Sequence, residues 1–234
     1  MHEARTISFA DAEHRIQALG IVGVGTLLRL GEEIRLAGPP QFASDAEGWR
    51  VSSAEGLELS LTPWAGATAL GGDGGSDAVP ARAIGTVASR PVEGLAAMYG
   101  DGGAGGDVAL ERMLAALFEE GPWAVVLTAE RPRGAAGHGE ERLAAVAFRG
   151  DPMEVVRFEG PRLSSTYDAG GLLSHAGLEL WESEDADRPT RIGGEALARG
   201  ELAHPDGKLT RVSFLAWHHN GLDGLGSYTI TPAA

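Results

Sequence analysis

Short alternating runs of hydrophobic and polar residues dominate the chain. In the segment 57–63, three leucines alternate with Glu58, Ser60 and Thr62 before Pro63 ends the run. A period of two is typical of a strand with one buried face, because successive side chains point to opposite sides of a sheet. The pattern predicts a half-buried strand here.

Compact apolar runs predict further strands. They cover residues 123–127, 143–148, 155–158, 209–217 and 226–230. Turn-forming Gly, Pro and Asp separate them at short intervals, which is typical of an all-β sandwich or barrel. The segment from Ser8 to Leu19 fits either a capped helix or strands joined by bends, and we favour strands.

One segment has the spacing of a helix. Four apolar residues between Leu110 and Leu117 fall on one face if residues 108–120 are helical. Asp107 is a suitable N-terminal cap, because its carboxylate accepts hydrogen bonds from free amides of the first turn. Gly121 and the proline after it would end the element. We therefore predict one short α-helix after a glycine-rich stretch.

The chain also contains the signs of an internal repeat. The tetrapeptide Gly-Leu-Glu-Leu occurs at residues 56–59 and again at 177–180. Upstream, residues 30–34 resemble 149–153, and downstream, residues 82–85 resemble 191–194. Alternating leucines and glycines also recur by chance in β proteins, but three landmarks in one order favour duplication. We expect a compressed first β unit over 1–100, a glycine-rich loop and helix over 101–122, and a second β unit over 123–234.

Composition narrows the classes of function. The chain has 33 acidic and 19 basic residues and a formal net charge of −14. This charge argues against nucleic-acid partners, because phosphates would be repelled. There is no cysteine, which excludes disulfide frameworks, thiolate catalysis and iron–sulfur clusters. No run approaches the roughly 20 apolar residues of a membrane span, so we expect a cytoplasmic protein.

Several motifs of the second half carry a family resemblance. They are residues 162–168, Ala176 to Glu182, Arg191 to Gly200, and the loop 131–139 with Arg-Pro-Arg-Gly and Gly-His-Gly. Over roughly residues 20–232 the chain resembles the tandem lipocalin-like proteins related to carotenoid 1,2-hydratase (hydroxyneurosporene synthase) and the AttH-type proteins. The resemblance implies two lipocalin-like barrel or sandwich units around an apolar ligand pocket and no redox cofactor. It carries over no catalytic residue.

Four residues are candidates for catalysis. His138 lies between glycines in a loop joining two apolar runs, where it would act as a general acid or base. Tyr167 and Asp168 precede an Ala-Gly-Gly turn and would donate or relay a proton. His218 ends a strand whose next residue, His219, points to the opposite face, so the pair does not chelate one metal. The plainer interpretation is that His138 lies in a surface loop and that the other three residues lie at ordinary strand ends. We expect no metal site.

Trp123, Trp181, Trp217 and Glu179 are candidates for ligand binding. The tryptophans lie on or beside predicted strands, where they would line an apolar pocket or fill a dry core. Glu179 and Trp181 share one face of their predicted strand, an arrangement suited to an unsaturated ligand but also found on exposed strands.

The resulting hypothesis is a protein that binds a small apolar molecule of isoprenoid or polyketide type. The family resemblance implies cofactor-free hydration or cyclisation, in which an acid protonates a double bond. A non-catalytic carrier with the same pocket and a structural protein with a filled interior are the alternatives, and a homodimer is one option for assembly. Whether the protein is an enzyme stays open at this point.

Overall fold

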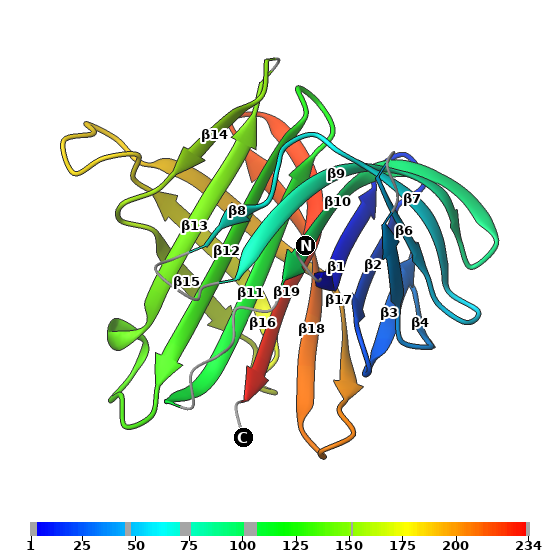
Figure 1. The fold of residues 1–234 in the computed structure, drawn as a ribbon. Helices are drawn as coiled ribbons and strands as arrows, with labels where there is room; N and C mark the ends of the chain where they lie inside the picture. The colour runs from blue at the N-terminus through cyan, green and yellow to red at the C-terminus, as the bar shows by residue number, and fades with distance from the viewer. Residues whose placement is uncertain (1–3, 45–47, 71–75, 101–106, 151, 233–234) are drawn as a thin grey trace.

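The computed structural model describes residues 4–44, 48–70, 76–100, 107–150 and 152–232. Two strongly curled antiparallel sheets make up the protein, and Figure 1 shows them side by side, the first in blue to teal and the second in green to red. This confirms the predicted all-β architecture of two related lipocalin-like units.

The first sheet has the strand order β4-β3-β2-β1-β10-β9-β7-β6-β5, with the short β8 paired to β9. Its strands are β1 (Ala4–Asp11), β2 (Ile16–Ile21), β3 (Gly25–Leu30), β4 (Glu33–Ala37), β5 (Gln41–Ser44), β6 (Trp49–Ser52), β7 (Leu57–Pro63), β8 (Thr68–Ala69), β9 (Asp77–Val87) and β10 (Arg90–Gly100). The segment from Ser8 to Leu19 thus forms strands, as we expected.

The second sheet has the order β14-β13-β12-β11-β19-β18-β17-β16-β15. Its strands are β11 (Val108–Phe118), β12 (Trp123–Pro132), β13 (Arg142–Arg149), β14 (Glu154–Arg157), β15 (Arg162–Tyr167), β16 (Leu173–Leu180), β17 (Thr190–Ala203), β18 (Leu209–His219) and β19 (Leu222–Pro232). A 3-10 helix, η1 (His138–Glu140), follows β12.

The two sheets have the same topology. Apart from β8, each strand of the first sheet has a counterpart at the same place in the second, with β1 matching β11, β7 matching β17, and β10 matching β19. The sequence landmarks agree with this only in part. Residues 30–34 and 149–153 both span the junction between the third and fourth strands of their unit.

The Gly-Leu-Glu-Leu landmark is displaced by one strand. Its first copy opens β7 and its second copy ends β16, whereas the strand order pairs β7 with β17. Residues 82–85 and 191–194 are displaced in the same way, since they lie on β9 and β17. Duplicated architecture is therefore present, but these two matches arise from a strand pattern that neighbouring strands share.

The predicted helix over 108–120 is wrong, because these residues form strand β11. Leu114 and Phe118 face the interior of the second sheet, while Ala115 and Leu117 pack between the two sheets. A strand buried on both faces carries a continuous apolar run in place of alternation, and this run happened to match helical spacing. The boundary segment expected to hold the helix therefore supplies a central strand.

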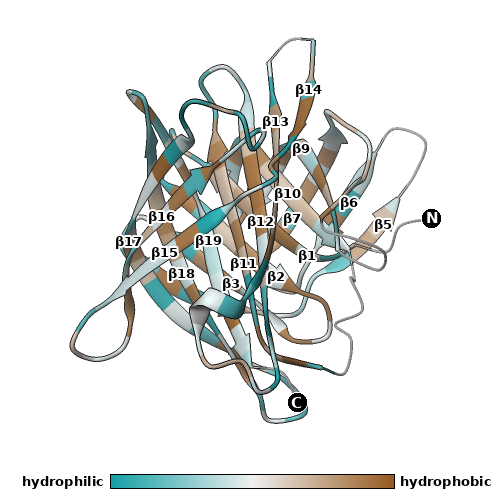
Figure 2. Ribbon diagram, turned by 90° about the vertical axis from the view of Figure 1, so that its left-hand side faces the viewer, coloured by the Kyte–Doolittle hydropathy of each residue, from teal (hydrophilic) through white to brown (hydrophobic). Residues whose placement is uncertain are grey.

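Each sheet encloses its own core, and a further core joins them. One buried cluster contains only residues of the second half, including Phe118, Leu178 and Trp217, and another contains only residues of the first half. Residues of both halves meet in the joint clusters, where Leu19 packs with Phe214. Figure 2 shows hydrophobic colour concentrated along the strands in the interior. The sheets are thus packed with their outer faces together.

No helix among the described residues is both long and apolar enough to cross a membrane.

Candidate functional site

A β-bulge in β17 changes which of its residues face the interior of the second sheet. In β17, Ile192 packs in the inner core, whereas Ala198 and Leu202 pack in the joint core between the sheets. The register shifts between Ala196 and Ala198. Such a shift moves the following side chains to the opposite face, and it turns Arg199 and the residues that alternate with it toward the interior.

Two rows of side chains cross the strands β17, β18 and β19 beyond this bulge. In one row, Ser213 is the cross-strand partner of both Arg199 and Tyr228. Because Ser213 is much smaller than its two neighbours, it leaves space between them. In the next row, Arg211 is the partner of both Glu201 and Ile230.

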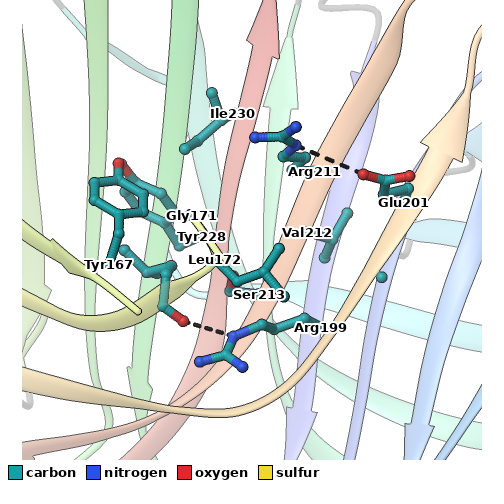
Figure 3. A pocket seen from close by; sticks show the side chains of 12 residues that line it. Tyr167, Gly171, Leu172, Arg199, Glu201, Arg211, Val212, Ser213, Tyr228 and Ile230 are labelled. Atoms are coloured by element: carbon teal, nitrogen blue, oxygen red, sulfur yellow. Dashed lines mark hydrogen bonds and ion pairs between the residues drawn. The ribbon is translucent and has the colours of Figure 1, made fainter. Parts of the chain in front are cut away.

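A cavity of about 300 Å3 lies over these rows, and we call it the Ser213 cavity (Figure 3). The hairpin of β15 and β16 covers it from the other side. Its lining consists of Tyr167, Gly171, Leu172, Leu173, Arg199, Gly200, Glu201, Arg211, Val212, Ser213, Tyr228 and Ile230. Most of the exposed lining is apolar, and the volume is at the low end for ligand pockets.

Two tyrosines form one wall of the cavity (Figure 3). The hydroxyl oxygen of Tyr228 lies 3.3 Å from Oγ of Ser165. Burial, above all, raises the pKa of Tyr228, and a contact with Tyr167 adds to this, while the charge of Arg112 acts in the opposite direction. Tyr228 is therefore a neutral hydroxyl at ordinary pH, able to donate a hydrogen bond to a ligand oxygen.

Arg199 fastens the covering hairpin. Its Nε donates a hydrogen bond of 2.6 Å to the carbonyl oxygen of Leu173, and its Nη1 lies 3.5 Å from Oδ2 of Asp168. Asp168 in turn accepts hydrogen bonds from the backbone amides of Gly170 and Leu172. These contacts close the turn from both sides, so Asp168 positions the hairpin.

A buried ionic cluster lies beyond Tyr228 and Ile230. Arg112 is the cross-strand partner of Ile230, and its Nη2 lies 2.8 Å from Oε1 of Glu141. Arg131 contacts the same carboxylate oxygen at 2.7 Å. Side chains of Arg112 and Glu141 are each only 3% exposed. Separating these buried charges would leave one of them unpaired and away from water, which is costly. The cluster therefore holds the strands at this end of the interior in place.

The candidate catalytic residues do not come together. Tyr167 lines the Ser213 cavity, and Asp168 adjoins it through Arg199. His218 lies elsewhere, on the outer face of the sheet, where its Nδ1 is 2.6 Å from Oδ1 of Asp223. It borders a second hollow of about 390 Å3 over Gly177 and Gly193.

His138 belongs to η1, but its side chain lies outside the described part of the structure. Its role as an acid or base stays a prediction.

The candidate ligand-binding residues occupy different surroundings. Trp217 is fully buried and donates a hydrogen bond from Nε1 to the carbonyl oxygen of Ala115, and Trp123 stacks on Phe118 at 4.6 Å between ring centroids. Both belong to the inner core of the second unit. They thus fill the interior and do not line the Ser213 cavity.

Trp181 and Glu179 lie away from that cavity as well. Trp181 borders a third hollow, of about 340 Å3, with Glu159 and Arg162. Glu179 forms ion pairs with Arg191 and Arg162 across neighbouring strands. This arrangement is that of a charged ladder on a sheet surface.

Sequence reasoning missed Ser213, Tyr228 and the lining arginines. One signal was available, because Arg211 and Ser213 share a strand face with the core residues Leu215 and Trp217. Two polar residues on the same strand face as two buried apolar residues indicate that the packed core ends along that face. The inward turn of Arg199, by contrast, depends on a bulge that the sequence does not mark.

Among the described residues, no group of three or more His, Asp or Glu side chains is placed to hold a metal ion.

Comparisons with known proteins extend the description of the fold. No protein-family model matches the sequence, and no curated protein matches it. Among solved structures, the chain is similar to a putative AttH from Nitrosomonas europaea, with a TM-score of 0.61 and 11% identity over 97% of this chain and 90% of that one. Similarity at this identity shows a shared fold. A structure of CghA with Sch210972 gives a TM-score of 0.49 and 11% identity, over 99% of this chain and 88% of that one.

Proposed function

We propose that the protein binds a small, mainly apolar molecule of isoprenoid or polyketide type in the Ser213 cavity. The observation that carries this proposal is the cavity itself, which lies where Ser213 is flanked by Arg199 and Tyr228. Apolar walls with a few convergent polar groups are typical of small-molecule sites. The fold shared with a putative AttH agrees with this role but does not identify the ligand.

The chemistry of the lining favours a carrier over an acid catalyst. Protonation of a double bond requires a strong acid close to the ligand. Tyr228 is a weaker acid than an ordinary tyrosine because burial raises its pKa. Glu201 in the lining and Asp168 beside it each lie in an ion pair with an arginine. We therefore propose binding without turnover, with hydration or cyclisation as the alternative outcome.

Farnesol, a sesquiterpene alcohol, is a suitable probe because it combines an isoprenoid body with one hydroxyl. We expect saturable binding to one site by isothermal titration calorimetry, a raised unfolding temperature, and farnesol recovered unchanged after prolonged incubation. Recovery of a hydrated or cyclised product would support the catalytic alternative.

The Ser213→Leu variant tests the location, because a larger side chain fills the gap between Arg199 and Tyr228. We expect the affinity for farnesol to fall at least about tenfold. Ser60→Leu, on the exposed face of β7 in the first sheet, is the matched control and should bind like the parent protein. Leu172→Lys, on the exposed lip of the cavity, provides a second test if Ser213→Leu disturbs folding. Undiminished binding by both cavity variants would contradict the proposal.

A further inference from the structure

The Ser213 cavity combines an apolar wall with a cation that makes no hydrogen bond. Arg211 lines the cavity, and its closest ionic contact is Nε to Oε1 of Glu201 at 3.6 Å. This distance is too long for a hydrogen bond. Among the described residues, none accepts a hydrogen bond from the side chain of Arg211. Its guanidinium donors are therefore available to a ligand.

The neighbouring arginine has a different role. Arg199 donates a short hydrogen bond to the carbonyl oxygen of Leu173 and lies near Asp168. These contacts fasten the covering hairpin. Figure 3 shows the two guanidinium groups at opposite ends of the cavity, with Ser213 between them. One arginine thus holds the wall, and Arg211 remains as the cation for ligand recognition.

Charge around the cavity differs from that of the whole chain. The protein carries a formal net charge of −14, whereas at the cavity Arg199 and Arg211 balance Glu201 in the lining and Asp168 beside it. The buried Arg112 lies behind Ile230 and acts on Tyr228 through its charge. At physiological salt, distant surface charges are largely screened beyond about 8 Å. The charges beside the cavity therefore act on a bound head group more strongly than the distant acidic surface does.

We propose that the ligand is an anionic amphiphile, a molecule with an apolar body and one carboxylate, and that Arg211 determines this specificity. This inference rests on the proposed function. The carboxylate would take the place of the Glu201 carboxylate at the guanidinium, which suits paired hydrogen bonding to two oxygens. The apolar body would lie along Ile230, Leu172 and the tyrosine rings.

Three probes that share one isoprenoid body and differ in the head group test the proposal. They are farnesoic acid, farnesol and farnesylamine, titrated calorimetrically into the full chain at neutral pH. We expect the acid to bind about tenfold more tightly than the alcohol. A charge-assisted hydrogen bond to a partly exposed arginine is expected to strengthen binding by about that factor. The amine should bind most weakly, and added salt should reduce the preference for the acid.

Two variants at exposed residues distinguish the preference for an acidic head group from the binding of the apolar body. Arg211→Gln should remove the preference for farnesoic acid, so that the acid and the alcohol bind with about equal affinity. Glu201→Gln should increase that preference, since the competing carboxylate is gone. Arg35→Gln, at a half-exposed arginine paired with Glu33 in the first sheet, is the matched control and should behave like the parent protein.

The possible failures are distinguishable. Equal affinity for acid and alcohol, with no effect of Arg211→Gln, would overturn the specificity and leave the proposed binding function standing. Absence of binding by all three probes would overturn both.

Discussion

The side-chain amide of Gln17 on β2 donates a hydrogen bond of 2.7 Å to the carbonyl oxygen of Gly226 on β19. The same amide donates to the carbonyl of Leu215, and the side-chain oxygen accepts a hydrogen bond from Arg29. Gln17 and Arg29 are both buried. One glutamine of the first sheet therefore connects a buried cation to the backbone of the second sheet, and it helps to fix how the two units pack.

Replacing this glutamine should loosen the joint between the units. Gln17→Leu leaves two carbonyl oxygens and the buried Arg29 without the partner they share, so we expect a loss of about 2–4 kcal/mol in the free energy of unfolding. Urea denaturation measures it. Gln41→Leu, at an exposed position of β5, is the control, and an equal effect of both changes would contradict the role of Gln17.

Two neighbouring glycines of β17 should differ in how well they tolerate alanine. A Cβ at Gly194 would collide with the ring of Trp217, whereas a Cβ at Gly193 would meet no atom within 4 Å. Gly194→Ala should cost about 1–3 kcal/mol of stability through overpacking. Gly193→Ala should stay within about 0.5 kcal/mol of the parent. Thermal unfolding of the two variants gives the comparison, and similar values for both would contradict the packing described for Trp217.

The pair of His14 and Asp11 should make stability depend on pH. His14 Nδ1 lies 2.8 Å from Oδ2 of the buried Asp11, and this hydrogen bond raises the pKa of His14. A raised pKa in the folded state means that the contribution is complete below the unfolded value of about 6.5 and is lost as pH rises through the folded value. His14→Gln should therefore destabilise more at about pH 5.5 than at about pH 9. Urea midpoints at both pH values test this, and an equal difference at each would contradict it.

The buried carboxylate of Glu141 should matter more than an exposed one. Glu141→Gln removes a negative charge that lies against Arg112 deep in the interior, so we expect a loss of about 3–5 kcal/mol in the free energy of unfolding. Glu182→Gln removes a half-exposed carboxylate from its pair with Arg149 and should cost less than about 1 kcal/mol. Chemical denaturation measures the loss in the free energy of unfolding for both variants. A loss for Glu141→Gln as small as that for Glu182→Gln would be inconsistent with the buried cluster.

The sequence revealed the β architecture both from alternating positions and from short apolar runs bounded by turn residues, as in β12. The strand β7 alternates buried leucines with exposed polar residues and was predicted from that pattern. The strand β11 was predicted as a helix because it is buried on both faces and lacks alternation. The local hydrophobic pattern indicates which residues are buried. It does not indicate that a second sheet covers the other face of the strand, because that depends on residues elsewhere in the chain.

The candidate site was predicted only at its edge. Tyr167 and Asp168 were singled out from their place before a glycine turn, and they lie at or beside the cavity. The tryptophans were expected to line a pocket or to fill a dry core, and Trp217 and Trp123 lie in the core. Ser213 escaped notice because its importance comes from being smaller than its cross-strand neighbours, Arg199 and Tyr228, which a register of distant strands brings beside it.

The central claim is that the second unit holds the ligand over Ser213. Methyl NMR of the isoleucine side chains tests it most directly, because Ile230 lines the cavity while Ile7 and Ile16 lie in the core of the first sheet. On titration with farnesol, we expect the Ile230 methyl resonance to shift with saturation and those of Ile7 and Ile16 to stay in place. Saturable shifts at Ile7 or Ile16, with Ile230 unchanged, would contradict the account.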